Sequence, residues 1–257
     1  MDLHLTKKII IVTGGAKGIG EAIVRLLSDE GAIPIILDKD EGAATQLVAQ
    51  LPTESLALSL DLTSSEACEN AIHTIIKKFG RIDGLVNNAG RNDSIGLENG
   101  SPTKFIESVN NNLGHYYFMA HYCLPHLKKS EGSIVNIGSK TALTGQGNTS
   151  GYAAAKGAIL ALTREWAVEL LPYSIRANAI IPAEVWTPLY ESWINTFPNP
   201  KEKLANIASS IPFEKRMTTA AEIADMAVFL LSHRASHITG QWIHVDGGYT
   251  HLDRAIH

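Results

Sequence analysis

The chain has 257 residues, of which 45% are hydrophobic and 19% charged, and its 26 acidic and 22 basic residues leave a formal net charge of −4. This composition is typical of a globular protein and argues against a general binder of nucleic-acid backbones, which carries a basic excess. No uncharged apolar run reaches the roughly 18 residues of a membrane-spanning helix, and the N-terminus lacks a signal-peptide pattern. The two distant cysteines, Cys68 and Cys123, exclude a disulfide scaffold or a zinc ribbon. We therefore expect a cytoplasmic protein that binds neither nucleic acid nor membrane.

Apolar segments rich in Ile and Val alternate with helical patterns along the chain. We predict strands at residues 9–12, 33–37, 56–60, 84–87, 133–137, 176–181 and 242–245. These segments are continuously apolar, as parallel strands buried on both faces are. Helical patterns lie at residues 18–30, 41–51, 64–79, 102–128, 150–172 and 220–231. Ser64 and the Ser101-Pro102 pair indicate helix starts, and Gly80 indicates a helix end.

Strand–helix alternation at this pitch predicts an α/β fold. Right-handed crossovers would build one doubly wound, seven-stranded parallel sheet with helices on both faces. Residues 184–216 break the rhythm with four prolines and several aromatic residues. No linker-like run, repeat or low-complexity segment divides the chain, so we predict a single domain over residues 1–257.

A glycine-rich turn joins the first strand to the first helix. In residues 13–20, Gly14, Gly18 and Gly20 follow a GxxxGxG spacing. Glycine is needed where a chain turns from strand to helix and where backbone approaches a pyrophosphate, which then lies on the helix N-terminus. A plain tight turn is the alternative. The position of the turn after the first strand favours a dinucleotide site of the Rossmann type.

An acidic residue, Asp38, ends the second strand, 18 residues after Gly20. A carboxylate at this offset hydrogen-bonds the ribose hydroxyls of the adenosine. It would also repel a 2′-phosphate, so Asp38 favours NAD over NADP. Lys17 and Lys39 argue weakly for NADP, because either could approach a 2′-phosphate. The alternative for both lysines is a solvated loop face.

Tyr152 and Lys156 form the strongest catalytic candidate, with Ser139 preceding them at the end of the fifth predicted strand. The i, i+4 spacing puts the tyrosine and the lysine on one helix face. We expect the Lys156 ammonium, with the positive nicotinamide ring nearby, to lower the pKa of Tyr152, which would then accept the proton of a substrate hydroxyl as a general base. Ser139 would hydrogen-bond the same oxygen as charge develops.

Together these motifs resemble the short-chain dehydrogenase/reductase family over the whole chain. Asp61 matches the family's aspartate near the adenine, and residues 87–90 match the segment that lies over the adenine ribose. Asn112 corresponds to the active-site asparagine that joins Ser139, Tyr152 and Lys156. Its neighbours Asn110 and Asn111 compete for that role, but the following Leu-Gly favours Asn112.

The resemblance implies a cofactor half at about residues 1–150 and a catalytic and substrate half at about 151–257. One departure is Ala183, which follows Pro182 where the family usually has glycine. Val185 and Thr187 are expected to meet the nicotinamide carboxamide. The implied cofactor residues are Gly14, Lys17, Gly18, Ile19, Gly20, Asp38, Lys39, Asp61, Leu62, Asn88, Ala89, Gly90, Tyr152, Lys156, Pro182, Val185 and Thr187.

Polar residues follow several of the predicted strands, at 91–93, 146–149 and 184. Amide and carboxylate groups aimed at one cleft suit a polyhydroxylated ligand, whose hydroxyls each need a partner. Loop hydrogen bonding is the alternative. Residues 145–152, 183–190 and 246–256 resemble bacterial L-fucose dehydrogenases, which oxidise C1 of the sugar to the lactone. The expected substrate residues are Asn92, Ser139, Gln146, Asn148, Tyr152, Glu184, Trp186 and Tyr190. The alternatives are another alcohol or ketone substrate, or a non-catalytic member of the fold.

Histidines and tyrosines crowd residues 115–126 but no carboxylate or cysteine completes a metal set, so we expect packing and subunit contacts there and no metal. Trp186, Tyr190, Trp193 and Phe197 suit either a lid over substrate or a buried face. The resemblance implies a homotetramer with closed two-fold symmetry. Leu252 and Ile256 in residues 250–257 would anchor that tail across a subunit boundary.

Overall fold

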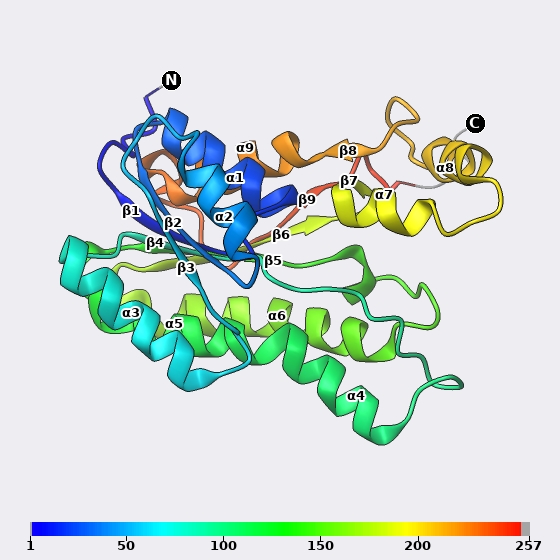
Figure 1. Ribbon diagram of the computed structural model, residues 1–257, viewed down its shortest axis with the longest axis horizontal. Coiled ribbons are helices and arrows are strands. Elements are labelled where there is room, and N and C mark those ends of the chain that lie inside the picture. The colour runs from blue at the N-terminus through cyan, green and yellow to red at the C-terminus, as the bar shows by residue number, and fades with distance from the viewer. Residues whose placement is uncertain (1, 253–257) are drawn as a thin grey trace.

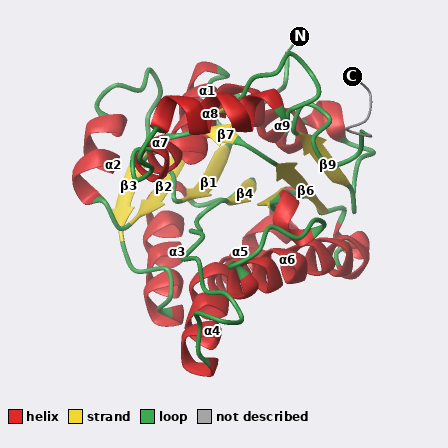
Figure 2. Cartoon of the chain, turned by 90° about the vertical axis from the view of Figure 1, so that its right-hand side faces the viewer, coloured by secondary structure: helices red, strands yellow, loops and turns green. Residues whose placement is uncertain are grey.

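The computed structural model describes residues 2–252 of the chain. Within them a parallel sheet has the strand order β3-β2-β1-β4-β5-β6-β9 (Figures 1 and 2). Its strands are β1 (Ile9–Thr13), β2 (Ile33–Asp38), β3 (Leu56–Ser59), β4 (Gly84–Asn87), β5 (Ser133–Ile137), β6 (Arg176–Pro182) and β9 (Trp242–Val245). The predicted doubly wound, seven-stranded fold is confirmed, and each strand ends within one residue of its predicted limits.

The strand order reverses at β1, which pairs with β2 on one side and with β4 on the other. In a sheet of this kind the loops after β1 and β4 leave in opposite directions and open a crevice at the carboxyl ends of the strands. The glycine-rich turn follows β1, and residues 88–90 follow β4. The topology therefore brings both predicted cofactor segments to one crevice.

Helices cover both faces of the sheet (Figure 1). On one face lie α1 (Gly18–Asp29), α2 (Glu41–Val48) and α9 (Ala220–Leu231). On the other lie α3 (Ser65–Phe79), α5 (His115–Ser130) and α6 (Ser150–Glu169). Side chains alternate across β1, so Ile10 belongs to the first core and Ile9 and Ile11 to the second.

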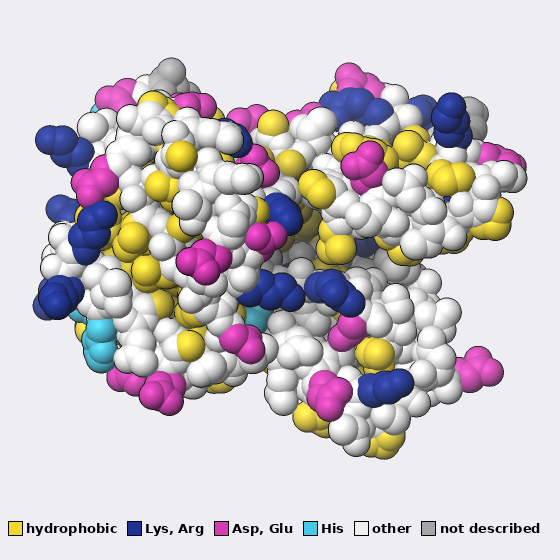
Figure 3. All heavy atoms as spheres, in the orientation of Figure 1, with side chains coloured by type: hydrophobic (Ala, Val, Ile, Leu, Met, Phe, Trp, Pro, Cys, Tyr) yellow, Lys and Arg dark blue, Asp and Glu magenta, His cyan; other side chains and the backbone are white. Residues whose placement is uncertain are grey.

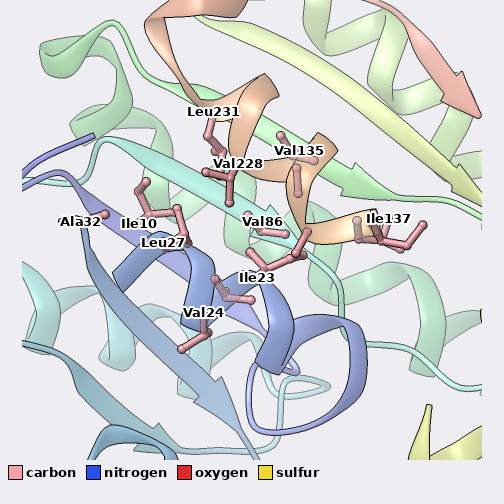
Figure 4. Close-up of a cluster of buried hydrophobic side chains, with 14 of the residues drawn as sticks. Ile10, Ile23, Val24, Leu27, Ala32, Val86, Val135, Ile137, Val228 and Leu231 are labelled. Atoms are coloured by element: carbon pink, nitrogen blue, oxygen red, sulfur yellow. The ribbon is translucent and has the colours of Figure 1, made fainter. Parts of the chain in front are cut away.

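The first core packs α1 against α9 over the middle of the sheet (Figure 4). Ile23 and Leu27 of α1 and Val228 of α9 are fully buried there. At roughly 1.5–3 kcal/mol for each buried aliphatic side chain, this packing holds α1, and so the turn before it, in place. The fold thus fixes the glycine-rich turn from the buried side.

The predicted helix at residues 102–128 is broken by a π-helical turn. It consists of α4 (Pro102–Val109), the π-helix Asn110–Gly114 and α5, which continues to Ser130. Single π turns frequently lie at functional sites because the extra residue redirects a side chain. The predicted helix starts at Ser64 and Ser101 are confirmed, since each side chain accepts a hydrogen bond from the backbone three residues on. Gly80 ends α3 in a left-handed conformation at φ 74°.

Residues 184–216 form a separate part beside the sheet edge. They contain β7 (Val185–Trp186), α7 (Pro188–Ile194) and α8 (Pro200–Ser209), and β7 pairs in parallel with β8 (Thr218–Thr219). Proline opens both helices at their first turn, where its missing N–H costs nothing. Figure 3 shows the surface hollowed between the part that carries α7 and α8 and the part that carries α4.

Two further properties concern the described residues. Among them no helix has the length and apolar character needed to cross a membrane. Cys68 and Cys123 are free and buried, and burial raises the pKa of the Cys68 thiol to about 11. The inert, buried thiols agree with the absence of a disulfide scaffold.

Candidate active site

The glycine-rich turn wraps tightly around the start of α1. Gly14 and Gly18 have left-handed backbones at φ 61° and 59°. A Cβ at Gly20 would overlap the carbonyl oxygen of Gly14, so no larger residue fits there. The residue before α1, Lys17, provides no side-chain cap. The first backbone N–H groups of α1 therefore point at a space that suits an anion such as a pyrophosphate.

Asn88 fastens this turn to the end of β4. Its side-chain Nδ2 donates to the carbonyl oxygens of Thr13 and Gly14, each at 3.0 Å. The backbone N–H groups of Asn88 and Ala89 both donate to Thr13 Oγ1, at 2.9 and 3.1 Å. The structure thus brings these predicted cofactor residues to the turn, where they also shape it.

Asp38 lies beside the same turn at the end of β2. Its carboxylate accepts from the backbone N–H of Ala16 and of Asp40, each at 3.0 Å. Lys17 is tied to Asp40 by an ion pair at 2.6 Å, and Lys39 is exposed. The lysines therefore lie on the solvated face that we named as their alternative, while the carboxylate is fixed next to the glycine turn.

The remaining predicted cofactor residues surround this position. Asp61 accepts from the N–H and hydroxyl of Thr63, which lowers the pKa of the Asp61 carboxyl. Ile19 and Leu62 pack against the two cores. Pro182 ends β6, Val185 is buried in β7, and a Cβ at Gly18 would lie 3.4 Å from the Thr187 side chain. Thr187 therefore borders the glycine turn, and the contact of Val185 and Thr187 with the nicotinamide carboxamide stays a prediction.

Four segments bring the catalytic candidates together. The π-helical turn points Asn112 inward, where it is buried, while Asn110 and Asn111 are exposed. The Oδ1 of Asn112 accepts from the backbone N–H of Arg91 at 2.7 Å. A Cβ at Gly90 would lie 3.2 Å from that Oδ1 and 3.6 Å from the Nζ of Lys156. This geometry favours Asn112 over its two neighbours as the active-site asparagine.

Tyr152 and Lys156 are presented by the first turns of α6. The Nζ of Lys156 lies 5.6 Å from the centre of the Tyr152 ring and donates to Ile137 O at 2.7 Å and to Tyr116 Oη at 3.0 Å. Ser139 follows β5, and its Oγ accepts from the hydroxyl of Thr141 at 2.9 Å. Ser139 also hydrogen-bonds the Tyr152 hydroxyl, which by itself lowers the pKa of that group.

The electrostatics of this pair differ from the expectation. We expected Lys156 to lower the pKa of Tyr152, but burial raises that pKa to about 12 in the protein alone. Burial also lowers the pKa of Lys156 to about 7, and its Nζ is turned toward Tyr116 and Ile137. An ammonium that is half neutral at pH 7 does not offset the desolvation of the phenol.

The proposed substrate residue Glu184 is occupied by other side chains. It forms an ion pair with Lys140, the residue after Ser139, and accepts from the Tyr190 hydroxyl at 2.7 Å. Only 9% of the Lys140 side chain and 12% of the Glu184 side chain are exposed. The Lys140 Nζ also lies 4.3 Å from the centre of the Tyr249 ring. We call Lys140, Glu184 and Tyr190 the charged wall.

Sequence reasoning missed Lys140 and Tyr249. The position of Lys140 directly after Ser139, which follows a strand, could have pointed to it. Nothing in the sequence indicates its pairing with Glu184, 44 positions away. Tyr249 could have been noticed only as part of the C-terminal resemblance. Residues 253–257 of the predicted tail lie outside the described part of the chain.

The other substrate candidates lie on exposed loops or on the aromatic helix α7. Gln146 and Asn148 are exposed, and Asn92 accepts from the backbone N–H of Ser94 within its own turn. Trp186 is 37% exposed, and its ring centre lies 6.2 Å from that of Tyr190. Rings from Tyr190 to Trp193 and on to Phe197 pack edge to face at 5.2 and 5.0 Å. These aromatic residues therefore pack along one face of the segment rather than forming a separate core.

The aromatic cluster in α5 divides into a buried and an exposed part. His115 and Tyr116 are buried, whereas Tyr117 and His121 are exposed and stack at 5.8 Å. The described residues hold no group of three or more His, Cys, Asp or Glu side chains suited to a metal ion. His115 and Tyr116 were expected to be packing or subunit-contact residues, and both are buried; the Tyr116 hydroxyl also accepts from Lys156.

Comparisons with known proteins agree with this architecture. A family model described as enoyl-(acyl carrier protein) reductase matches residues 14–250. L-fucose dehydrogenase of Bos taurus is 37% identical over 249 residues, which cover 96% of this chain and 91% of that protein. The crystal structure of Cj0485 dehydrogenase is 50% identical with a TM-score of 0.96, and the match covers 100% of this chain and 99% of that one. The ligand-free aldohexose dehydrogenase of Thermoplasma acidophilum is 30% identical with a TM-score of 0.90, over 98% of both chains.

Proposed function

Because the chain belongs to the short-chain dehydrogenase/reductase family of nicotinamide-dependent oxidoreductases, we propose that it oxidises C1 of an aldose, L-fucose or a related sugar, to the lactone. The observation that carries the sugar assignment is the charged wall directly after Ser139. Every sugar hydroxyl that leaves water needs a hydrogen-bond partner, and a wall of charged and hydroxyl groups supplies such partners. The names of the bovine and Thermoplasma relatives, which are sugar dehydrogenases, support the same class.

In this proposal Tyr152 is the general base. Its phenolate oxygen, held by Ser139, accepts the proton of the C1 hydroxyl and becomes the phenol, and Ser139 donates to the same substrate oxygen. Lys156 lies behind Tyr152, and its charged form favours the phenolate. Asn112 supports the site through its bond to the backbone of Arg91. NAD, when bound, supplies the nicotinamide that accepts the hydride from C1.

The residues present fit a dinucleotide. A Cβ at Gly14 would meet the backbone of Ala89 and one at Gly20 the carbonyl oxygen of Gly14, so the glycines keep the turn tightly folded at the uncapped N-terminus of α1, where a pyrophosphate would lie. Asp38 is fixed beside that turn and Lys17 is engaged by Asp40, which supports NAD as the cofactor rather than NADP. A carboxylate held by two backbone N–H groups cannot turn away from a 2′-phosphate without losing those bonds.

We further propose that the protein works as a cytoplasmic homotetramer. The outer faces of α5 and α6 expose large apolar side chains, including Tyr117 at 53% and Val168 at 68%. Large exposed apolar side chains on these helix faces suit a subunit contact, which would remove them from water. Sedimentation at micromolar concentration tests the assembly, and a monomer would contradict it.

The second candidate is a dehydrogenase or reductase for another alcohol or ketone. The exposed apolar residues Trp186, Leu189 and Trp193 around the same opening favour it, because they would suit a less polar substrate. A non-catalytic member of the fold would not need Asn112, Ser139, Tyr152 and Lys156 to converge as they do.

A substrate panel with NAD and with NADP separates these candidates. We expect reduced nicotinamide to form fastest with L-fucose, L-galactose or D-arabinose, and far more slowly with steroids or long-chain alcohols. Absence of turnover with all three sugars at millimolar concentration, together with turnover of an apolar alcohol, would overturn the sugar assignment and leave the second candidate.

A further inference from the structure

The buried side of the catalytic lysine carries a contact that the reaction proposed above does not use. The Nζ of Lys156 donates to Ile137 O at 2.7 Å and to Tyr116 Oη at 3.0 Å, and the Tyr116 hydroxyl donates to the same Ile137 O at 2.9 Å. The three atoms form a closed triangle between α5, α6 and the end of β5. Tyr116 is fully buried, and Lys156 is only 2% exposed.

We propose that Tyr116 is a positioning residue for the reaction, which holds the ammonium of Lys156 behind Tyr152 and keeps it charged. An ammonium buried in protein needs acceptors for its protons, and a carbonyl and a hydroxyl are the two that this site provides. The Tyr116 oxygen can accept from Lys156 because its own proton is committed to Ile137. This role deepens the proposed function and rests on its assignment of Tyr152 as the base.

Tyr116 reaches this place through the π-helical turn. Asn112 lies in that turn and Tyr116 one helical turn later, so both face the sheet rather than solvent. The neighbouring Tyr117 points outward and is 53% exposed. Tyr116 therefore belongs to the same buried face that carries the active-site asparagine.

The charge state of Lys156 responds to the groups that face it. These are His115 and Tyr116 from α5 and Tyr152 from its own helix, whereas Gly90 and the Asn112 amide on the side of β4 bring no charge. Burial lowers the pKa of His115 to about 4, so this ring is neutral above about pH 5. The Tyr116 hydroxyl is protonated throughout, because burial raises its pKa far above the usual value. In the protein alone Lys156 is therefore the group of this set whose charge changes in the working range, while Tyr152 changes charge as it takes up and releases the proton of the substrate.

Tyr116→Phe removes the acceptor and keeps the ring. A hydrogen bond to the charged form favours that form, so its loss lowers the pKa of Lys156 further. The ammonium is then lost at lower pH, and Tyr152 becomes harder to ionise. We expect the rising limb of kcat/KM for sugar oxidation to move to higher pH by about one unit. At neutral pH this corresponds to a loss of roughly tenfold in kcat/KM.

Tyr122→Phe is the matched control. It removes a hydroxyl from the same helix, and that hydroxyl hydrogen-bonds Ser65 at 2.9 Å rather than Lys156. The pH dependence of kcat/KM is measured for wild type and both variants, with circular dichroism to establish folding. Phenolate formation is followed in parallel by ultraviolet difference absorbance, with Tyr152→Phe as the blank, because this readout needs no substrate.

A shift in Tyr116→Phe alone, in both readouts, supports the role. The positioning role of Tyr116 is overturned by an unchanged pH profile of kcat/KM or by an equal shift in Tyr122→Phe. A shift of the Tyr116→Phe profile to lower pH also overturns it, because Tyr116 would then keep the ammonium away from Tyr152. If wild type turns over no sugar, the proposed function fails, while the phenolate titration still decides the role of Tyr116.

Discussion

The charged wall allows a sharp test of what Glu184 does. Glu184→Gln leaves the Lys140 ammonium beside a neutral amide, with about nine-tenths of both original side chains removed from water. Removing one partner of a buried ion pair costs about 3–5 kcal/mol, because the other charge is left without compensation. The Gln amide oxygen keeps one hydrogen bond, so we take the lower figure of about 3 kcal/mol. For a chain of this length that corresponds to a fall in Tm of roughly 6–12 °C.

The assay is thermal unfolding followed by circular dichroism at one protein concentration, with the KM for the sugar measured alongside. Glu191→Gln is the control, since Glu191 lies exposed on α7 in the segment that follows. We expect it to leave Tm within about 2 °C. The double variant Lys140→Met/Glu184→Leu removes both charges and should lose less than the two single variants together. A Glu184→Gln protein with wild-type Tm would refute this reasoning, because the ion pair with Lys140 would then contribute nothing to stability, whatever happens to the KM.

Three further predictions follow from the site. Tyr152→Phe should lower kcat by at least about 100-fold while the NADH dissociation constant, measured by fluorescence, stays within about twofold; retention of more than a tenth of the wild-type rate would contradict the general base. Asp38→Ala should lower the ratio of kcat/KM with NAD to kcat/KM with NADP. A wild-type protein that prefers NADP would show that the Asp38 carboxylate does not determine the cofactor preference. For Lys156, burial lowers the folded-state pKa from 10.5 to about 7, so the unfolded chain binds more protons between these values and stability rises with pH across that window. From pH 7 to pH 9 the unfolding free energy of wild type, measured in urea titrations, should rise by about 2 kcal/mol relative to that of Lys156→Met. Equal slopes of unfolding free energy against pH in the two proteins would contradict the lowered pKa of Lys156.

The parts of the fold that could be predicted are those encoded by neighbouring residues. The strands and the glycine turn are local patterns, and the parallel sheet with right-handed crossovers follows from the alternation of strands and helices. The π turn could not be predicted, because residues 110–114 read as a continuous helix and the extra residue is set by packing of Asn112 and Tyr116 against the sheet. The pairing of Lys140 with Glu184 and of Lys156 with Tyr116 joins residues 44 and 40 positions apart. No periodicity reports such contacts, which arise only when the strand ends meet.

Two buried lysines flank the reacting groups, and they differ in the partners that hold their charge. Lys140 is given a carboxylate partner, so its position depends on Glu184 and on the segment that carries α7. Lys156 is given two neutral oxygens and no carboxylate among the contacts described here, so its charge is held only by hydrogen bonds. A charge held in this way changes when a neighbouring group changes, whereas the Lys140–Glu184 ion pair fixes the positions of both side chains. The fold therefore assigns structural rigidity to the lysine beside Ser139 and proton responsiveness to the lysine beside Tyr152. Tyr152 must release its proton in each turnover, so it needs a neighbouring lysine whose charge can change, which is Lys156. The charged wall needs the fixed position that the ion pair gives Lys140.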